Sequence, residues 1–353
     1  MSKLKPLKPN IFSNTLSSLY TAIIHIRNII YDLFPGLAKK TGRYTISIGG
    51  IHTGGTGKTP MAMLVGSHFL KKDIGIAYLS RGYGRKSSNP VIVSPMNQKN
   101  WEEIGDEPAM IHSLLSDSWL GIGPNRYKNA LKILPELSKK AIFILDDGFQ
   151  HRKIFRDKNI LCIPASIFQD RVLPVGYLRE PVSSLKRADI ICIIGSLDET
   201  ESMIKIKKTI SEILPKVHIY IIYQIAENWV NLKSGQQLKK ITLKKPLLLS
   251  GIANPQRFVK LVESMGVTPY KIVNYEDHHI FRSREIDNEI DSQVDGIITT
   301  EKDIIRLTGI NLVKCSNIWY LKIKLIFFDN YSQTDFYYNI QKKFFIYYNK
   351  KEY

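Results

Sequence analysis

The segment that decides the fold is Gly54-Gly55-Thr56-Gly57-Lys58-Thr59, which lies between an apolar run at 44–48 and a helical run at 61–70. In such a strand, turn and helix, glycines let backbone N–H groups approach phosphate oxygens, and the helix N-terminus favours negative charge. Lys58 can then reach the β- and γ-phosphates, and the Thr59 hydroxyl can bind Mg²⁺. We therefore predict a nucleotide phosphate-binding loop that extends from Thr53 to Thr59.

Around this loop, short β-branched runs alternate with helical stretches. This pattern is typical of a parallel sheet whose two faces are covered by helices. We therefore predict an α/β fold with a P-loop NTPase-like parallel sheet over residues 36–216. The expected strands are Tyr44–Ile48, Ile76–Ser80, Ala141–Leu145, Ile160–Ile163 and Ile190–Ile194.

A second series of elements follows and predicts a smaller α/β domain over residues 243–312. The flanking strand-rich segments, 217–230 and 318–330, are expected to pair as a two-stranded ribbon between the domains. A C-terminal helix within 332–353 is expected to return to the first domain. The second domain has expected strands at Pro246–Ser250, Thr268–Val273 and Gly296–Thr299, with helices at Pro255–Met265 and Arg284–Ile290.

The N-terminal segment, residues 1–35, combines basic residues (Lys3, Lys5 and Lys8) with a partly apolar stretch at 16–34. Polar and charged residues interrupt this stretch, so a signal peptide and a spanning helix of about 20 apolar residues are both disfavoured. The helical spacing of the apolar residues fits an amphipathic helix in a membrane interface. It fits equally a helix packed on the sheet, and the sequence leaves both alternatives open.

Composition narrows the class of protein. A chain of 353 residues is long enough for two domains, and its 44% hydrophobic content excludes a disordered chain. A net charge of +18 favours phosphate-rich partners such as nucleotide, anionic lipid or nucleic acid, without choosing among them. Cys162, Cys192 and Cys315 are odd in number and lack a CxxC spacing, which argues against disulfides and zinc and favours a reducing compartment.

Three acidic clusters are candidates for chemistry. Asp146 and Asp147 end an apolar strand, as in a Walker B segment, and side chains on alternate faces of a strand cannot both bind one metal ion. Asp106 and Glu107 precede a helical stretch, where acids are also common N-caps. The third cluster, Asp277-His278-His279, lacks further ligands at zinc spacing, so we expect acid/base chemistry across the interdomain cleft.

Three further tracts carry charge at expected strand ends or in loops. The tract 79–86 contains Arg81 and can contact phosphates or form a solvated loop. The tract 171–181 mixes Arg171 and Arg179 with apolar residues, which suits an acylated, phosphorylated ligand. The tract 299–303 can close the cleft or cap the following helix.

These motifs, in this order, resemble the tetraacyldisaccharide 4′-kinase (lipid A 4′-kinase) family. That resemblance implies an enzyme that uses ATP and Mg²⁺ to phosphorylate the 4′-hydroxyl of a tetraacyldisaccharide 1-phosphate at the cytoplasmic face of the bacterial inner membrane. It also implies two α/β domains joined by a ribbon. The motifs are SIGGIHTGGTGKTP (47–60), LSRGYGRK (79–86), GDEP (105–108), LDDGFQH (145–151), LPVGYLREP (173–181), SGIANPQRF (250–258), DHH (277–279) and TEKD (300–303).

The resemblance assigns roles to residues of this chain. It places the catalytic base on Asp106, and we select His278 as its partner. Lys58, Asp146 and Asp147 complete the expected catalytic set, while Thr59, Asp147 and Glu107 are candidate metal ligands. Before Lys58 the chain departs from the family form G-N-[IL]-[ST]-V-G-G, with Gly50, His52 and Thr53 instead. The candidate substrate residues are Arg81, Gln150, His151, Arg171 and Arg179.

We expect a glycolipid substrate, contact with a membrane surface as a peripheral or monotopic protein, no nucleic-acid partner and a monomer. Alternative functions are a P-loop NTPase of another kind, either a metal-chaperone-like or GTPase-like enzyme or a nucleic-acid-associated ATPase. The sequence contains no N-K-x-D guanine motif, which disfavours the GTPase. A membrane-binding module without catalysis does not need the acids and Lys58 together.

Overall fold

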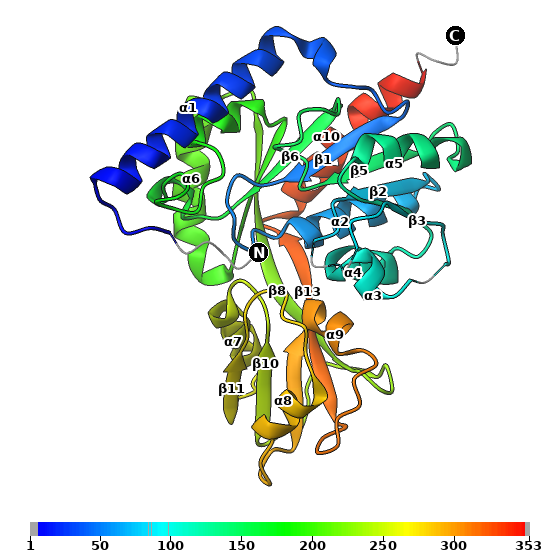
Figure 1. The fold of residues 1–353 in the computed structure, drawn as a ribbon, viewed down its shortest axis with the longest axis vertical. Helices are drawn as coiled ribbons and strands as arrows, with labels where there is room; N and C mark the ends of the chain where they lie inside the picture. Colours follow the sequence, from blue (N-terminus) through cyan, green and yellow to red (C-terminus); the bar gives the residue numbers. More distant parts are fainter. Residues whose placement is uncertain (1–5, 84, 86, 98, 350–353) are drawn as a thin grey trace.

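The computed structural model describes residues 6–83, 85, 87–97 and 99–349. Lys3, Lys5 and the final residues of the predicted C-terminal segment, 350–353, lie outside the described residues. Figure 1 shows a larger unit and a smaller unit connected by the two long strands β8 (His218–Asn231) and β13 (Ile318–Phe327). These strands pair antiparallel, so they form the ribbon that the sequence predicts.

The larger unit is built on a mainly parallel sheet with the strand order β8-β7-β6-β1-β5-β2-β4-β3. Between neighbours in this order the described strands pair parallel, except that the edge strand β3 pairs antiparallel with β4. This order places β1, which precedes the phosphate loop, directly beside β5, which ends in Asp146. The strands are β1 (Tyr44–Gly49), β2 (Ile76–Ser80), β3 (Val91–Val93), β4 (Trp119–Ile122), β5 (Ile142–Asp146), β6 (Lys158–Ile163) and β7 (Ile190–Gly195).

Helices cover both faces of this sheet, and alternate residues of β5 show how. Ile142 and Ile144 pack in the core that contains α2 and the C-terminal helix α10. Phe143 and Leu145 pack on the opposite face, in the core that contains α5. The predicted α/β class is therefore confirmed, and α10 does return to the larger unit. The helices are α2 (Lys58–Leu70), α3 (Trp101–Ile104), α4 (Asp106–Leu114), α5 (Arg126–Ile133), α6 (Thr200–Ile213) and α10 (Asn330–Asn349).

The smaller unit continues the same sheet beyond the ribbon in the order β11-β10-β12-β13. Leu247 and Leu249 pack on the face of α8 and α9, and Leu248 packs on the face of α7. The unit is therefore a second α/β layer structure with its own core. Its elements are β10 (Pro246–Ser250), α7 (Pro255–Ser264), β11 (Lys271–Asn274), α8 (Ser283–Glu289), β12 (Gly296–Thr300) and α9 (Glu301–Leu307), and β9 (Gln237–Leu238) adds to β8.

Some element bounds differ from the expected ones. The strands β3 and β4 were not expected, because each is only three or four residues long and β4 contains Gly121. β4 is nevertheless a parallel strand paired with β2, and this pairing buries it. α4 begins at Asp106 rather than at 109, so the acid pair lies inside the first turn of the helix.

The N-terminal helix α1 (Ile11–Leu33) lies along the outside of the larger unit, at the upper left of Figure 1. Polar groups attach it: the Ser17 hydroxyl donates to the Val172 carbonyl at 2.9 Å, and the Tyr20 hydroxyl donates to the Arg179 carbonyl at 3.0 Å. Its apolar side chains remain largely exposed, for example Ile23 at 57% and Ile26 at 59%. Among the described helices, none is long and apolar enough to cross a bilayer.

Candidate active site

The phosphate loop occupies the turn between β1 and α2. Its last glycine, Gly57, caps α2 in a left-handed conformation with φ of +73°. A Cβ atom there would also lie 2.9 Å from Ile194, so both conformation and space require glycine. α2 therefore begins at Lys58, and its N-terminal backbone N–H groups lack partners within the helix. A strand, a glycine-rich turn and a helix N-terminus therefore follow one another here, and phosphate binding by residues 53–59 stays a prediction.

Lys58 faces Asp147, the second acid after β5. The Lys58 ammonium lies 3.9 Å from an Asp147 carboxylate oxygen, and the Arg179 guanidinium donates to the other oxygen. Burial raises the pKa of Asp147, but these two cations outweigh burial and hold it below its ordinary value. Asp147 Oδ1 is buried and has no hydrogen-bond partner in the described structure, so it is a charged oxygen ready for a cation.

Asp146 points elsewhere. Its Oδ2 accepts a hydrogen bond from the Ser80 hydroxyl at 3.0 Å, and its backbone carbonyl accepts one from Arg126 at 2.5 Å. Burial, followed by the charges of Glu107 and Asp147, raises the pKa of Asp146 to about 6. The two adjacent carboxylates therefore differ in direction and charge, and Asp147 is the one beside Lys58.

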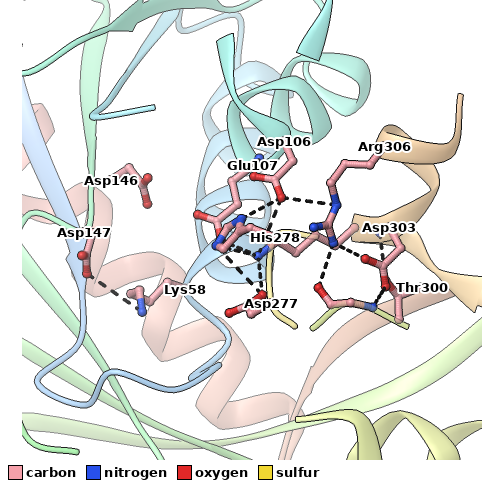
Figure 2. A network of polar contacts seen from close by, with 12 residues as sticks. Lys58, Asp106, Glu107, Asp146, Asp147, Asp277, His278, Thr300, Asp303 and Arg306 are labelled. Atoms are coloured by element: carbon pink, nitrogen blue, oxygen red, sulfur yellow. Dashed lines mark hydrogen bonds and ion pairs between the residues drawn. The ribbon is translucent and has the colours of Figure 1, made fainter. Parts of the chain in front are cut away.

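Asp106 and His278 meet across the two units, as Figure 2 shows. The Nδ1 atom of His278 lies 2.8 Å from Oδ2 of Asp106, while Oδ1 accepts the Glu107 backbone N–H at 2.9 Å. Asp106 is buried in the first turn of α4, where the helix dipole favours negative charge. His278 extends from a turn between β11 and α8 with φ of +64°. The sequence separates these residues by 172 positions, but the fold places them in contact.

Lys302 of α9 also contacts the Asp106 and His278 pair. Its ammonium lies 3.2 Å from Glu107, 3.3 Å from Asp277 and 3.3 Å from Nε2 of His278. Because an ammonium can only donate, Nε2 accepts, and the ring hydrogen of a neutral His278 is on Nδ1, directed at Asp106. Burial raises the pKa of Asp106, but the His278 hydrogen bond and the Lys302 charge lower it to about 2.

Arg306, one turn beyond Lys302, holds the loop that presents His278. Its guanidinium donates to the carbonyls of Gly251 and His279 at 2.9 and 3.0 Å and pairs with the buried Asp303. The Asp303 carboxylate in turn accepts the Gly251 N–H. The sequence indicated the 299–303 tract as a candidate but not its proximity to Asp106. The tract and Asp106 come together because α9 packs on α4.

A basic cavity of about 320 Å³ is lined in part by Gln150, which follows β5. The Gln150 amide donates to the carbonyl of Gly50, the residue after β1, at 3.1 Å. Burial, followed by the charge of Arg126 and its neighbours, lowers the pKa of His151 to about 3. Such surroundings favour an anion. The cavity is lined by Arg27, Tyr31, Arg81, Pro124, Arg126, Gln150, His151, Arg152 and Lys153.

A wider groove of about 700 Å³ lies between α1 and the loop at 170–182. It joins polar residues of α1, including Ser17 and His25, to apolar residues of the loop, including Val172 and Leu178. Arg171 lines this groove, whereas Arg179 points to Asp147. The predicted substrate residues therefore occupy three places: the basic cavity (Arg81, Gln150 and His151), the groove (Arg171) and the side of the phosphate loop (Arg179).

No group of three or more histidine, cysteine, aspartate or glutamate side chains forms a metal cluster within the described ranges. The three cysteines are buried and free. Arg126 was not among the predicted residues, because a single arginine at a helix start carries no signal in the sequence.

Comparisons with known proteins place these features in one family. A family model described as tetraacyldisaccharide-1-P 4′-kinase matches residues 10–343. The tetraacyldisaccharide 4′-kinase of Aquifex aeolicus is 34% identical over 315 residues, which cover 88% of this chain and 92% of that protein. That of Bdellovibrio bacteriovorus is 31% identical over 306 residues, covering 83% and 88%. A crystal structure of LpxK from Aquifex aeolicus in complex with ATP has a TM-score of 0.71 at 29% identity and covers 94% of this chain and 98% of that chain.

Proposed function

Since this chain belongs to the tetraacyldisaccharide-1-P 4′-kinase family, we propose which of its residues carry out the reaction of that family. The protein is an ATP-dependent kinase that phosphorylates the 4′-hydroxyl of tetraacyldisaccharide 1-phosphate, with Mg²⁺ as cofactor. The observation that carries the assignment of residues is the contact of Asp106 with His278, which joins the smaller unit to the unit that holds the phosphate loop.

The phosphate loop, residues 53–59, binds the ATP phosphates through backbone N–H groups and Lys58. Asp147 and the Thr59 hydroxyl would hold Mg²⁺, because Asp147 has a buried oxygen without a hydrogen-bond partner in the described structure. Glu107, whose Oε1 lies 3.2 Å from the Lys302 ammonium, is the other candidate ligand. When bound, the ion neutralises charge on the transferring phosphoryl group. The positive charges of Arg179 and Lys58 then offset part of the negative charge of Asp147 and of the ATP phosphates.

Asp106 accepts the proton of the sugar hydroxyl. The new bond forms between the 4′-oxygen and the γ-phosphorus, the bond to ADP breaks, and the proton passes to an Asp106 oxygen. With a pKa of about 2, Asp106 is a weak base in this arrangement. A loose phosphoryl-transfer transition state acidifies the hydroxyl only as the new bond forms, so a weak base in the correct position suffices. The Nδ1–H of His278 keeps Asp106 oriented.

The glycolipid substrate carries one phosphate and four acyl chains, and the protein has a candidate binding site for the phosphate and another for the acyl chains. Arg81, Gln150 and His151 in the basic cavity fit the phosphate, because several cations converge there. The groove beside Arg171 fits acyl chains. Both openings lie against α1, so a lipid held in the membrane reaches them from the same side.

The exposed apolar face of α1 supports contact with a membrane surface. Two of the three buried residues of this helix, Ser13 and Asn28, are polar, and most of its apolar residues remain exposed, unlike those of a helix packed on a core. Such a helix can insert its apolar face into a bilayer interface. We propose a peripheral monomer at the cytoplasmic face of the inner membrane, where ATP is available. All the candidate site residues come from one chain.

The test is phosphate transfer in vitro. Purified protein is incubated with Mg²⁺, ATP labelled at the γ-phosphate and a detergent-dispersed tetraacyldisaccharide 1-phosphate, and the lipid is assayed for label. Lys58→Ala should abolish transfer. Asp106→Asn should lower kcat about 100-fold or more while ATP affinity stays within a few-fold, since the loss is in proton acceptance. The matched control is Asp117→Asn in an exposed loop. Near-normal kcat in Asp106→Asn would remove Asp106 as the base.

A further inference from the structure

His52 lies immediately before the phosphate loop, residues 53–59. Its Nδ1 accepts the backbone N–H of Gly54 at 2.8 Å, a bond that a hydroxyl two residues earlier can also make. A Cβ at Gly54 would lie 2.8 Å from the imidazole, so the glycine admits the ring. Because Nδ1 accepts, the ring hydrogen of a neutral His52 is on Nε2.

That Nε2 atom lies 3.1 Å from a carboxylate oxygen of Asp170, which a serine at position 52 is too short to reach. Asp170 is the first residue of the loop that lines the groove under α1. Its carboxylate also accepts the backbone N–H groups of Arg171 at 2.7 Å and Tyr177 at 3.0 Å. Asp170 therefore holds the loop in shape and binds His52 with the same group.

Backbone hydrogen bonds reinforce this connection. The Thr53 N–H donates to the Tyr177 carbonyl at 2.9 Å, and the Arg179 N–H donates to the Ile51 carbonyl at 2.6 Å. Segments 51–53 and 177–179 thus form a short ladder between the phosphate loop and the groove loop. Within this ladder, His52 is the side chain that contacts both an N–H of the phosphate loop and the groove-lining Asp170.

We propose that His52 is a positioning residue that connects the phosphate loop to the groove, so that the affinity for ATP depends on whether lipid fills the groove. The inference rests on the proposed function, which places acyl chains there. Lipid that orders the loop at 170–182 fixes Asp170, which fixes the imidazole and thereby the Gly54 N–H. Lipid and ATP then strengthen the binding of each other by the same factor. Without lipid, the phosphate loop is less ordered and ATP is held more weakly.

The experiment measures the Kd of a fluorescent, non-hydrolysable ATP analogue with and without detergent-dispersed tetraacyldisaccharide 1-phosphate. In the unmodified protein, lipid should tighten analogue binding roughly three- to tenfold, within what one charge-assisted hydrogen bond supplies. His52→Ser keeps an acceptor for Gly54 but cannot reach Asp170. In this variant, lipid should leave the Kd of the analogue unchanged. His218→Ala, at an exposed histidine that starts β8, is the control.

Two results overturn the inference. One is a full lipid effect in His52→Ser, and the other is a Kd in the unmodified protein that lipid does not change. The labelled-phosphate assay separates these results from a failure of the proposed function. Transfer to lipid with a lipid-independent Kd removes only the role of His52. The absence of transfer removes the kinase assignment and, with it, this inference.

Discussion

Replacing Asp146 by asparagine should stabilise the protein, and more so as the pH rises. The pKa of Asp146 in the folded chain is about 6, against an ordinary value of 3.8. An acid with a raised pKa costs nothing below its unfolded pKa, and it destabilises the fold as the pH rises through its folded pKa. The full cost is roughly 3 kcal/mol, and about half of it develops between pH 5 and pH 8.

The assay is urea unfolding of both proteins without ATP or Mg²⁺. The difference in unfolding free energy between Asp146→Asn and the unmodified protein should grow by on the order of 1 kcal/mol from pH 5 to pH 8. Asp147→Asn is the matched control, for which we expect a change in stability of the opposite sign. Its lowered pKa means that the charge of Asp147 stabilises the fold above the unfolded pKa and that this stability is lost as the pH falls. Asp147→Asn should therefore be less stable at pH 8. The same pH trend in both variants would refute the reasoning.

Two further predictions concern Lys302 and α1. Lys302→Met removes the charge that orients Asp106 and His278, so kcat should fall about 10- to 100-fold with ATP affinity unchanged. Lys260→Met, which removes an exposed ion pair between the two units, is the kinetic control, and equal kcat values for both variants would contradict the prediction. Polar substitution of three exposed isoleucines of α1 should weaken binding to phospholipid vesicles about 100-fold, at ~1 kcal/mol for each half-exposed side chain, as measured by flotation. Ile213→Asn on α6, also exposed, should leave binding unchanged, and unaltered flotation of the triple variant would count against a membrane role for α1. The three substitutions are Ile23→Asn, Ile26→Asn and Ile30→Asn.

Much of the fold could be predicted because its signals are local. The phosphate loop is contiguous in sequence, and its glycines and Lys58 have meaning only between a strand and a helix. The β-branched runs marked the longer buried strands. The strands β3 and β4 could not be found in this way, because three or four residues carry too little pattern, and it is pairing with a neighbouring strand that buries β4.

The sequence by itself determined which residue types are available for chemistry: a glycine-rich loop that we predict binds phosphates, carboxylates that we propose for a metal ion and a base, and an amphipathic N-terminal helix. Only the tertiary structure decided which groups meet. Lys302 reaches Glu107 across 195 positions, and the different surroundings of Asp146 and Asp147 give their pKa values opposite directions. It also decided that the apolar face of α1 points outward, because polar contacts hold its other face. Residue types are set along the chain, whereas burial and long-range pairing exist only after folding.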